Sequence, residues 1–220
     1  MQQVLVTGAN RGIGLELCRQ LKEQGHEVTA VCRNSSDALD ELNIQVMDQC
    51  DVADQASVSQ LAQKLGSQRY DMIINNAGIL TRNALGDIDY SSVMQQFQVN
   101  AMAPLMVTEA LLEHLKPAAK VAIVTSRMGS MSDNDSGGHY GYRMSKAAVN
   151  MAGTSLAVDL KPKGIAVGLL HPGYVKTDMT GGQGYVDTAH AAAGLLTRMN
   201  ELNLENSGTF WHADGERIPW

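Results

Sequence analysis

Short apolar, β-branched runs alternate along the chain with longer stretches in which apolar residues recur at helical spacing. The runs are almost continuously apolar, as expected when both faces of a parallel strand are covered. They predict strands at Gln3–Thr7, Glu27–Cys32, Ile44–Met47, Met72–Asn75, Val121–Thr125, Ile165–Leu170 and Gly208–His212. The helical spacing predicts helices at Gly12–Gln24, Asp54–Leu65, Ser91–Leu115, Tyr142–Leu160 and Asp187–Asn200.

This strand–helix order continues without a long linker, an internal repeat or a low-complexity segment. It predicts an α/β protein with a single-domain Rossmann fold: a doubly wound, about seven-stranded parallel sheet with helices on both faces. The 220 residues fit one such domain spanning residues 1–220. Right-handed crossovers would bring the carboxyl ends of the strands to one edge, where ligands usually bind.

The composition narrows the function classes. Apolar residues make up 44% and charged residues 18%, and the net charge of −6 with no basic run argues against nucleic-acid binding. No apolar run reaches membrane-spanning length and the opening MQQVLVTG lacks signal-peptide character, so we expect no membrane association and a cytoplasmic location. Three cysteines without C-x-x-C spacing fit reduced thiols, and six scattered histidines predict no metal site.

A glycine-rich loop, T-G-A-N-R-G-I-G at residues 7–14, follows the first strand and opens the first helix. Glycines in this context allow a tight turn and the close approach of a pyrophosphate, which the helix N-terminus then attracts. The alternative is that Gly8, Gly12 and Gly14 serve only the turn and its packing. The G-x-x-x-G-x-G spacing resembles the cofactor loop of the short-chain dehydrogenase/reductase family, and the resemblance spans almost the whole chain.

The end of the second strand bears on the choice of cofactor. An acidic residue about 20 positions after the glycines usually binds the ribose 2′-hydroxyl, but here Cys32 and Arg33 occupy that place. Arg33 and Arg11 suit a 2′-phosphate, so we expect NADP(H), by roughly a hundredfold over NAD(H). The alternatives are two solvated arginines, or NAD(H) binding through Asp37.

Further family landmarks follow in order. The resemblance implies that Asp51 contacts the adenine, that small residues in N-N-A-G let the backbone approach the ribose, and that a P-G turn covers the nicotinamide with Thr177 on its carboxamide. Asp51 could instead cap a helix, and the other motifs could be simple turns. The expected cofactor-binding residues are Gly8, Asn10, Arg11, Gly12, Ile13, Gly14, Arg33, Asp51, Val52, Asn76, Ala77, Gly78, Tyr142, Lys146, Pro172, Gly173, Val175 and Thr177.

Tyr142 and Lys146 lie four residues apart in G-Y-R-M-S-K, so a helix would place them on one face. A cation ~6 Å from a phenol at an effective dielectric of ~20 contributes roughly 2.8 kcal/mol and would lower its pKa by about two. Tyr142 would then exchange a proton near neutral pH. Tyr140 should lie before the helix and off this face, as a pocket wall or surface aromatic. The alternative is a surface Tyr–Lys pair of an amphipathic helix.

The resemblance supplies two more catalytic residues. Ser126 ends a central strand in the position of the family's catalytic serine, although Ser130 or an ordinary loop hydroxyl is possible. Asn100 matches the asparagine that distorts its helix and carries a water-linked proton path to the lysine; otherwise it is a helix-surface amide. Ser126 and Tyr142 are 142 − 126 = 16 apart, wider than is usual, and a polar loop, M-S-D-N-D-S-G-G, could absorb the extra residues.

This loop and the following Y-R-x-S-K-A-A-x-N resemble the branch of Sniffer-type carbonyl reductases and C-factor proteins. The prediction is an NADPH-dependent reductase of aldehydes and ketones, with a short lid within residues 178–185. The long helices predict a homodimer or homotetramer. One alternative is a signalling protein that binds NADP(H) with little turnover. A nucleotide-sugar epimerase or dehydratase of the extended type would need a larger C-terminal region.

Overall fold

The computed structural model describes all 220 residues and contains one seven-stranded sheet in which every neighbouring pair is parallel. The strand order is β3-β2-β1-β4-β5-β6-β7. The direction of winding reverses between β1 and β4, so a crevice opens beside their carboxyl ends. The strands are β1 (Gln3–Thr7), β2 (Glu27–Val31), β3 (Gln45–Met47), β4 (Tyr70–Asn75), β5 (Leu115–Val124), β6 (Ala166–His171) and β7 (Phe210–His212). The doubly wound Rossmann fold predicted from the sequence is confirmed.

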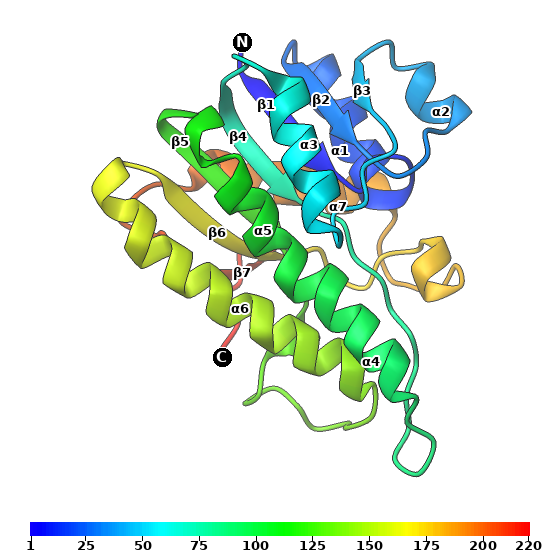
Figure 1. The fold of residues 1–220 in the computed structure, drawn as a ribbon. Coiled ribbons are helices and arrows are strands. Elements are labelled where there is room, and N and C mark those ends of the chain that lie inside the picture. Colours follow the sequence, from blue (N-terminus) through cyan, green and yellow to red (C-terminus); the bar gives the residue numbers. More distant parts are fainter.

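Helices cover both faces of the sheet (Figure 1). On one face lie α1 (Gly12–Glu23) and α7 (Thr188–Glu201), which pack against each other. The other face carries α3 (Gln55–Leu65), α4 (Tyr90–Phe97), α5 (Ala103–Ala110) and α6 (Tyr140–Leu160). A one-turn helix, α2 (Asp37–Asp40), follows β2 and is capped by the side chain of Ser36. No helix combines the length and apolar character needed to cross a bilayer.

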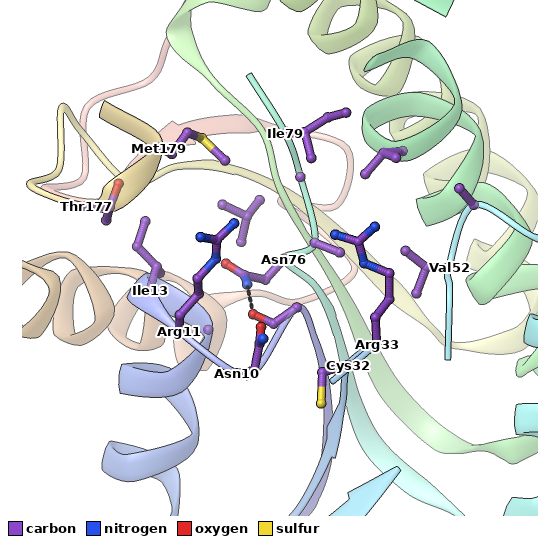
Figure 2. Close-up of a pocket in the computed structure, with 18 of the residues that line it drawn as sticks. Asn10, Arg11, Ile13, Cys32, Arg33, Val52, Asn76, Ile79, Thr177 and Met179 are labelled. Atoms are coloured by element: carbon purple, nitrogen blue, oxygen red, sulfur yellow. Dashed lines mark hydrogen bonds between the residues drawn. The ribbon is translucent and has the colours of Figure 1, made fainter. Parts of the chain in front are cut away.

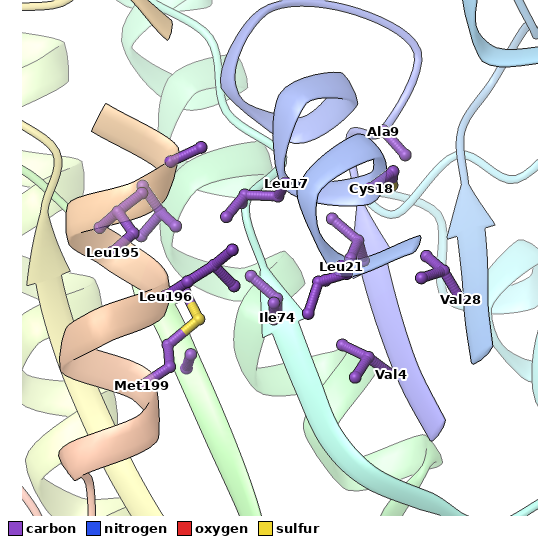
Figure 3. Close-up of a cluster of buried hydrophobic side chains, with 14 of the residues drawn as sticks. Val4, Ala9, Leu17, Cys18, Leu21, Val28, Ile74, Leu195, Leu196 and Met199 are labelled. Atoms are coloured by element: carbon purple, nitrogen blue, oxygen red, sulfur yellow. The ribbon is translucent and has the colours of Figure 1, made fainter. Parts of the chain in front are cut away.

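Successive residues of β1 pack into opposite layers of the core. Val4 and Val6 lie with Leu17 of α1 and Leu195 of α7 (Figure 3), whereas Leu5 belongs to the cluster beneath α3 and α5. Because all of these side chains are completely buried, each contributes about 1.5–3 kcal/mol of hydrophobic stabilisation. The continuous apolar run of β1 therefore reflects burial from both sides and fixes its carboxyl end between two helical layers.

The helix predicted at Ser91–Leu115 is not a single regular helix. Its first part is α4, followed by a π-helical turn, η1 (Gln98–Met102), then α5 and a short 3-10 turn, η2 (Leu112–His114). The chain leaves α-helical geometry at Leu111, and after η2 the strand β5 begins at Leu115, six residues before the predicted strand. The ion pair between Lys116 and Asp71, at 2.8 Å, joins this early part of β5 to β4.

Candidate active site

A cavity of about 700 Å³ opens at the carboxyl ends of the strands. It extends from the glycine loop after β1 to the beginning of α6. Most of the residues predicted to bind cofactor line it: Gly8, Asn10, Arg11, Gly12, Ile13, Gly14, Arg33, Asp51, Val52, Asn76, Ala77, Gly78, Tyr142, Lys146, Pro172 and Thr177. The fold thus gathers residues from six separate segments around one space.

The glycine loop is built by contacts that exclude side chains. A Cβ on Gly14 would lie 2.1 Å from the Gly8 carbonyl oxygen, and Gly8 adopts a positive φ of 66°. Helix α1 then begins at Gly12, its first three residues line the cavity, and the Arg11 side chain makes no capping hydrogen bond to it. No acidic residue occupies its first turn. An uncapped helix N-terminus of this kind is suited to a phosphate.

Thr7 and Asn76 tie the glycine loop to the end of β4. The Asn76 Nδ2 atom donates to the carbonyls of Thr7 and Gly8 at 3.1 and 3.2 Å, and the Thr7 hydroxyl accepts from the backbone N–H groups of Asn76 and Ala77. Gly8 packs directly on Ala77, since a Cβ on Gly8 would lie 2.7 Å from the Ala77 Cα. Asn76 therefore joins the carboxyl ends of the neighbouring strands β1 and β4.

Two guanidinium groups project into the same cavity from the glycine loop and from the segment after β2 (Figure 2). Both Arg11 and Arg33 are exposed, and the Arg11 Nη1 atom lies 3.4 Å from the Asp178 carboxylate on the opposite rim. Asp37, the alternative acidic partner for a ribose, is not among the residues that line the cavity. The positive charge at this end of the site therefore comes from Arg11 and Arg33.

Asp51 serves the local turn and also lines the cavity. Its Oδ1 atom accepts from the Ala53 N–H at 3.0 Å, whereas the N-cap of α3 is Asp54. On the opposite side, Gly173 holds a φ of 89° in the turn after β6. Val175 is buried and pairs with Val186 behind the cavity wall. Neither Gly173 nor Val175 lines the cavity.

Tyr142 and Lys146 project from the first turns of α6 and are both buried. The Lys146 ammonium lies 5.6 Å from the centre of the Tyr142 ring and donates to the Val124 carbonyl at 3.0 Å. A surface Tyr–Lys pair is therefore excluded. Helix α6 begins at Tyr140, so the prediction that Tyr140 precedes the helix is wrong; the left-handed conformation of His139 sets this earlier start.

Burial dominates the electrostatics of the pair. It raises the pKa of Tyr142 to about 12, although the nearby Ser126 hydroxyl acts to lower that pKa. Burial also lowers the pKa of Lys146 from 10.5 to about 8, because it disfavours the charged ammonium. The prediction that Lys146 brings the phenol into the neutral range is wrong, since the Coulomb estimate left out this loss of solvation.

Ser126 and Asn100 are buried just behind the cavity lining. Ser126 lies two residues after the end of β5 and caps the 3-10 turn η3 (Arg127–Gly129) by accepting from the Met128 N–H. Asn100 lies in the π-helical turn, where its amide exchanges two hydrogen bonds with the backbone of Ile79 and donates to the Ser145 hydroxyl at 3.0 Å. The predicted distortion of the helix at Asn100 is confirmed.

Most of the remaining lining residues were not predicted, and many are neighbours of residues that were; Asp178 and Met179 belong to the segment predicted as the lid. The remaining lining residues are Val31, Cys32, Asn34, Cys50, Ala53, Ile79, Thr81, Gln95, Gln98, Val99, Val124, Thr125, Asp178 and Met179. Adjacency in sequence to Arg33, Asp51, Asn100 or Ser126 could have indicated several of them. Nothing in the sequence indicated Gln95, because whether its side chain reaches the cavity depends on how α4 is rotated about its own axis.

The chain belongs to the short-chain dehydrogenase family, whose model matches residues 2–185. The protein is therefore a member of an oxidoreductase family. The 1-hydroxy-2-glutathionyl-2-methyl-3-butene dehydrogenase of Rhodococcus sp. (strain AD45) is 41% identical, and the alignment covers 100% of both chains. The C-signal protein of Myxococcus xanthus is 47% identical over 68% of this chain and 92% of its own length.

Two solved structures share the complete fold. The carbonyl reductase Sniffer of D. melanogaster superimposes with a TM-score of 0.93 at 30% identity, covering 100% of both chains. An NADPH-bound carbonyl reductase from chicken fatty liver gives a TM-score of 0.91 at 31% identity, covering 100% of this chain and 99% of the other. The resemblance to Sniffer-type carbonyl reductases predicted from the sequence is confirmed.

Proposed function

We propose that this protein is an NADPH-dependent reductase that converts an aldehyde or ketone into an alcohol. One observation carries the proposal: a single cavity joins an uncapped, glycine-lined helix N-terminus to the buried Tyr142–Lys146 pair. The carbonyl reductase structures, one of which holds NADPH, support the same class of reaction.

The residues present fit NADP(H). A Cβ on Gly12 would project toward Thr177, 3.6 Å from its methyl group, so glycine keeps open the space between this loop and the opposite rim. The α1 N-terminus would bind the pyrophosphate, and Arg11 and Arg33 would bind the 2′-phosphate through charge-assisted hydrogen bonds. Asp51 and Val52 would border the adenine, while Pro172 and Thr177 would border the nicotinamide. Lys146 would hydrogen-bond the nicotinamide ribose.

Side chains of the protein would donate the proton and stabilise the charge that remains after its transfer. When bound, NADPH supplies the hydride that reaches the carbonyl carbon. Tyr142 donates its phenolic proton to the carbonyl oxygen, and the Ser126 hydroxyl donates a hydrogen bond to the same oxygen. The Lys146 ammonium stabilises the tyrosinate that remains, and Asn100 holds the wall of the site through Ile79. With a pKa near 12, Tyr142 is protonated at neutral pH, which favours the reductive direction.

A short lid at residues 178–185 would leave the substrate side open. Its base is closed by backbone hydrogen bonds from Tyr185 to Tyr174 and from Lys176 to Val186. Between these ends lie the one-turn η5 (Asp178–Thr180) and three glycines, all with positive φ. Because only Asp178 and Met179 of this segment line the cavity, we expect the pocket to accept carbonyl compounds of varied size.

The proposal includes a homodimer or homotetramer formed through the helices on the α4–α6 side. Met144, Met151 and Val158 are exposed on α6 at intervals of seven residues, so they form one apolar stripe. Their exposed fractions of 55%, 69% and 72% are large for apolar side chains, and a partner helix would remove that surface from water.

The direct test is a panel of aldehydes, ketones and diketones assayed with NADPH and, in parallel, with NADH. Reduction of at least one class, with NADPH strongly preferred, is the expected result. Tyr142→Phe should lower kcat by about 10²–10⁴ while NADPH affinity persists, because the phenol acts only on the reacting oxygen. No turnover across the panel, or full activity of Tyr142→Phe, would refute the proposal.

The similarity to C-signal favours one alternative, a signalling protein with little turnover. The two functions differ in their need for the phenolic oxygen. A signalling protein should keep its biological effect and its NADPH binding after Tyr142→Phe. A reductase whose product mediates the effect should lose that effect together with its activity.

A further inference from the structure

Asn150 connects separate parts of the proposed active site although it does not line the cavity. It follows Tyr142 by eight residues and Lys146 by four, so all three side chains lie on one face of α6. The Asn150 side chain is only 3% exposed. A buried amide inside a helix is destabilising unless its polar atoms find partners, which makes its contacts informative.

Both contacts of the Asn150 amide go to the serine turn, defined here as Thr125–Gly129. The Thr125 hydroxyl donates to Asn150 Oδ1 at 2.7 Å, and Asn150 Nδ2 donates to the Gly129 carbonyl at 3.4 Å. Thr125 precedes Ser126, and Gly129 closes the turn by donating its N–H to the Ser126 carbonyl at 2.8 Å. One side chain of α6 therefore holds both ends of the segment that carries Ser126.

The same turn also packs directly on the backbone of α6. A Cβ on Gly129 would lie 2.7 Å from the Lys146 carbonyl carbon and 2.8 Å from its oxygen. This contact presses the turn against the helix at Lys146, and the Asn150 amide secures it one helical turn later. Packing alone would still allow the serine turn to slide along the helix surface, whereas two directional hydrogen bonds hold it in one position.

We propose that Asn150 is a positioning residue, whose amide fixes the serine turn on α6 so that the Ser126 hydroxyl stays beside that of Tyr142. The inference rests on the proposed function, because its catalytic consequence requires Ser126 to act on the substrate oxygen. The lowering effect of Ser126 on the pKa of Tyr142 is consistent with this proximity. Since a displacement of about 1 Å can cost about 100-fold in rate, Asn150→Leu should lower kcat about 10- to 100-fold.

A double-mutant cycle tests whether Asn150 acts through Ser126. Asn150→Leu, Ser126→Ala and the double variant are compared for kcat, for the KM of NADPH and for NADPH binding by fluorescence. The exposed helical Asn200→Leu serves as the matched control. Asn150→Leu should reduce kcat in the wild-type background and have little further effect after Ser126→Ala, with NADPH affinity unchanged throughout. If Asn150→Leu lowers kcat equally with and without Ser126→Ala, or lowers kcat in neither background, the inference is overturned.

Hydrogen exchange separates this inference from the proposed reaction. Backbone amides of residues 125–130 should exchange faster in Asn150→Leu than in wild type, whether or not a substrate has been found. If the wild-type protein reduces no compound on the panel, the proposed function is refuted. If the amides of residues 125–130 exchange at the same rate in Asn150→Leu as in wild type, the positioning role is refuted independently. If Asn150→Leu does not fold, Thr125→Val removes one of the two hydrogen bonds and should give a smaller change in the same direction.

Discussion

Replacing Lys146 by methionine should stabilise the protein while it removes activity. The Lys146 ammonium is buried, with a pKa of about 8 in place of 10.5, which at 1.36 kcal/mol per pH unit corresponds to about 3 kcal/mol of lost stability at pH 7. Methionine keeps the unbranched stem but leaves the Val124 carbonyl without its donor, at about 1 kcal/mol. The net gain is about 2 kcal/mol, or about 4–8 °C in Tm for a chain of this size.

The pH dependence supplies the sharper test. Between pH 8 and 10.5 the native Lys146 has released its proton while the unfolded chain still binds one, so wild-type stability rises with pH in that window. The advantage of Lys146→Met should therefore shrink from pH 8 to 10. Thermal unfolding at pH 7, 8, 9 and 10 measures this, with the exposed Lys163→Met as control. A destabilised Lys146→Met, or an advantage that does not vary with pH, would refute the reasoning.

Three further predictions concern the cofactor and the assembly. Arg33→Ala should lower the ratio of kcat/KM for NADPH over NADH at least tenfold by removing one guanidinium from the 2′-phosphate, while the exposed Arg69→Ala leaves the ratio unchanged. Gly14→Ala should lower NADPH affinity more than tenfold in a fluorescence titration, because its Cβ would lie 2.1 Å from the Gly8 oxygen. Met151→Glu should shift the protein toward monomer in light scattering; an unchanged mass would exclude the α6 stripe as the interface.

The sheet and its helical layers follow from local pattern, because each apolar run is long enough to specify a buried strand. The region after Asp89 shows where such reasoning stops. The apolar spacing there continues through the π-helical turn and α5, so the sequence alone indicates one helix. What breaks it is tertiary: Asn100 turns inward to bond the backbone of Ile79, 21 residues away.

The candidate site was predicted where motifs fix both residue type and spacing, as in the glycine loop and the Tyr142–Lys146 pair. Its electrostatics were not, because the pKa of Tyr142 depends on burial that no local pattern encodes. The contribution of Asn150 was also missed, although it stands eight residues after Tyr142. Its partners belong to a turn more than 20 residues away in the chain, and only the folded structure brings them together.

Because the chain forms a π-helical turn at Gln98–Met102, the number of residues in this region matters as much as their types. Because a π-helical turn holds one residue more than a regular turn, forcing it into regular helix without a deletion would rotate everything up to Ala110 by about 100° around the helix axis relative to α4. Val107, now buried, would then swing out of the core. Deleting one residue from the turn would instead restore regular pitch and keep α5 facing the sheet, but Asn100 would withdraw from Ile79. A one-residue gap in this stretch should therefore leave the fold intact and damage the site.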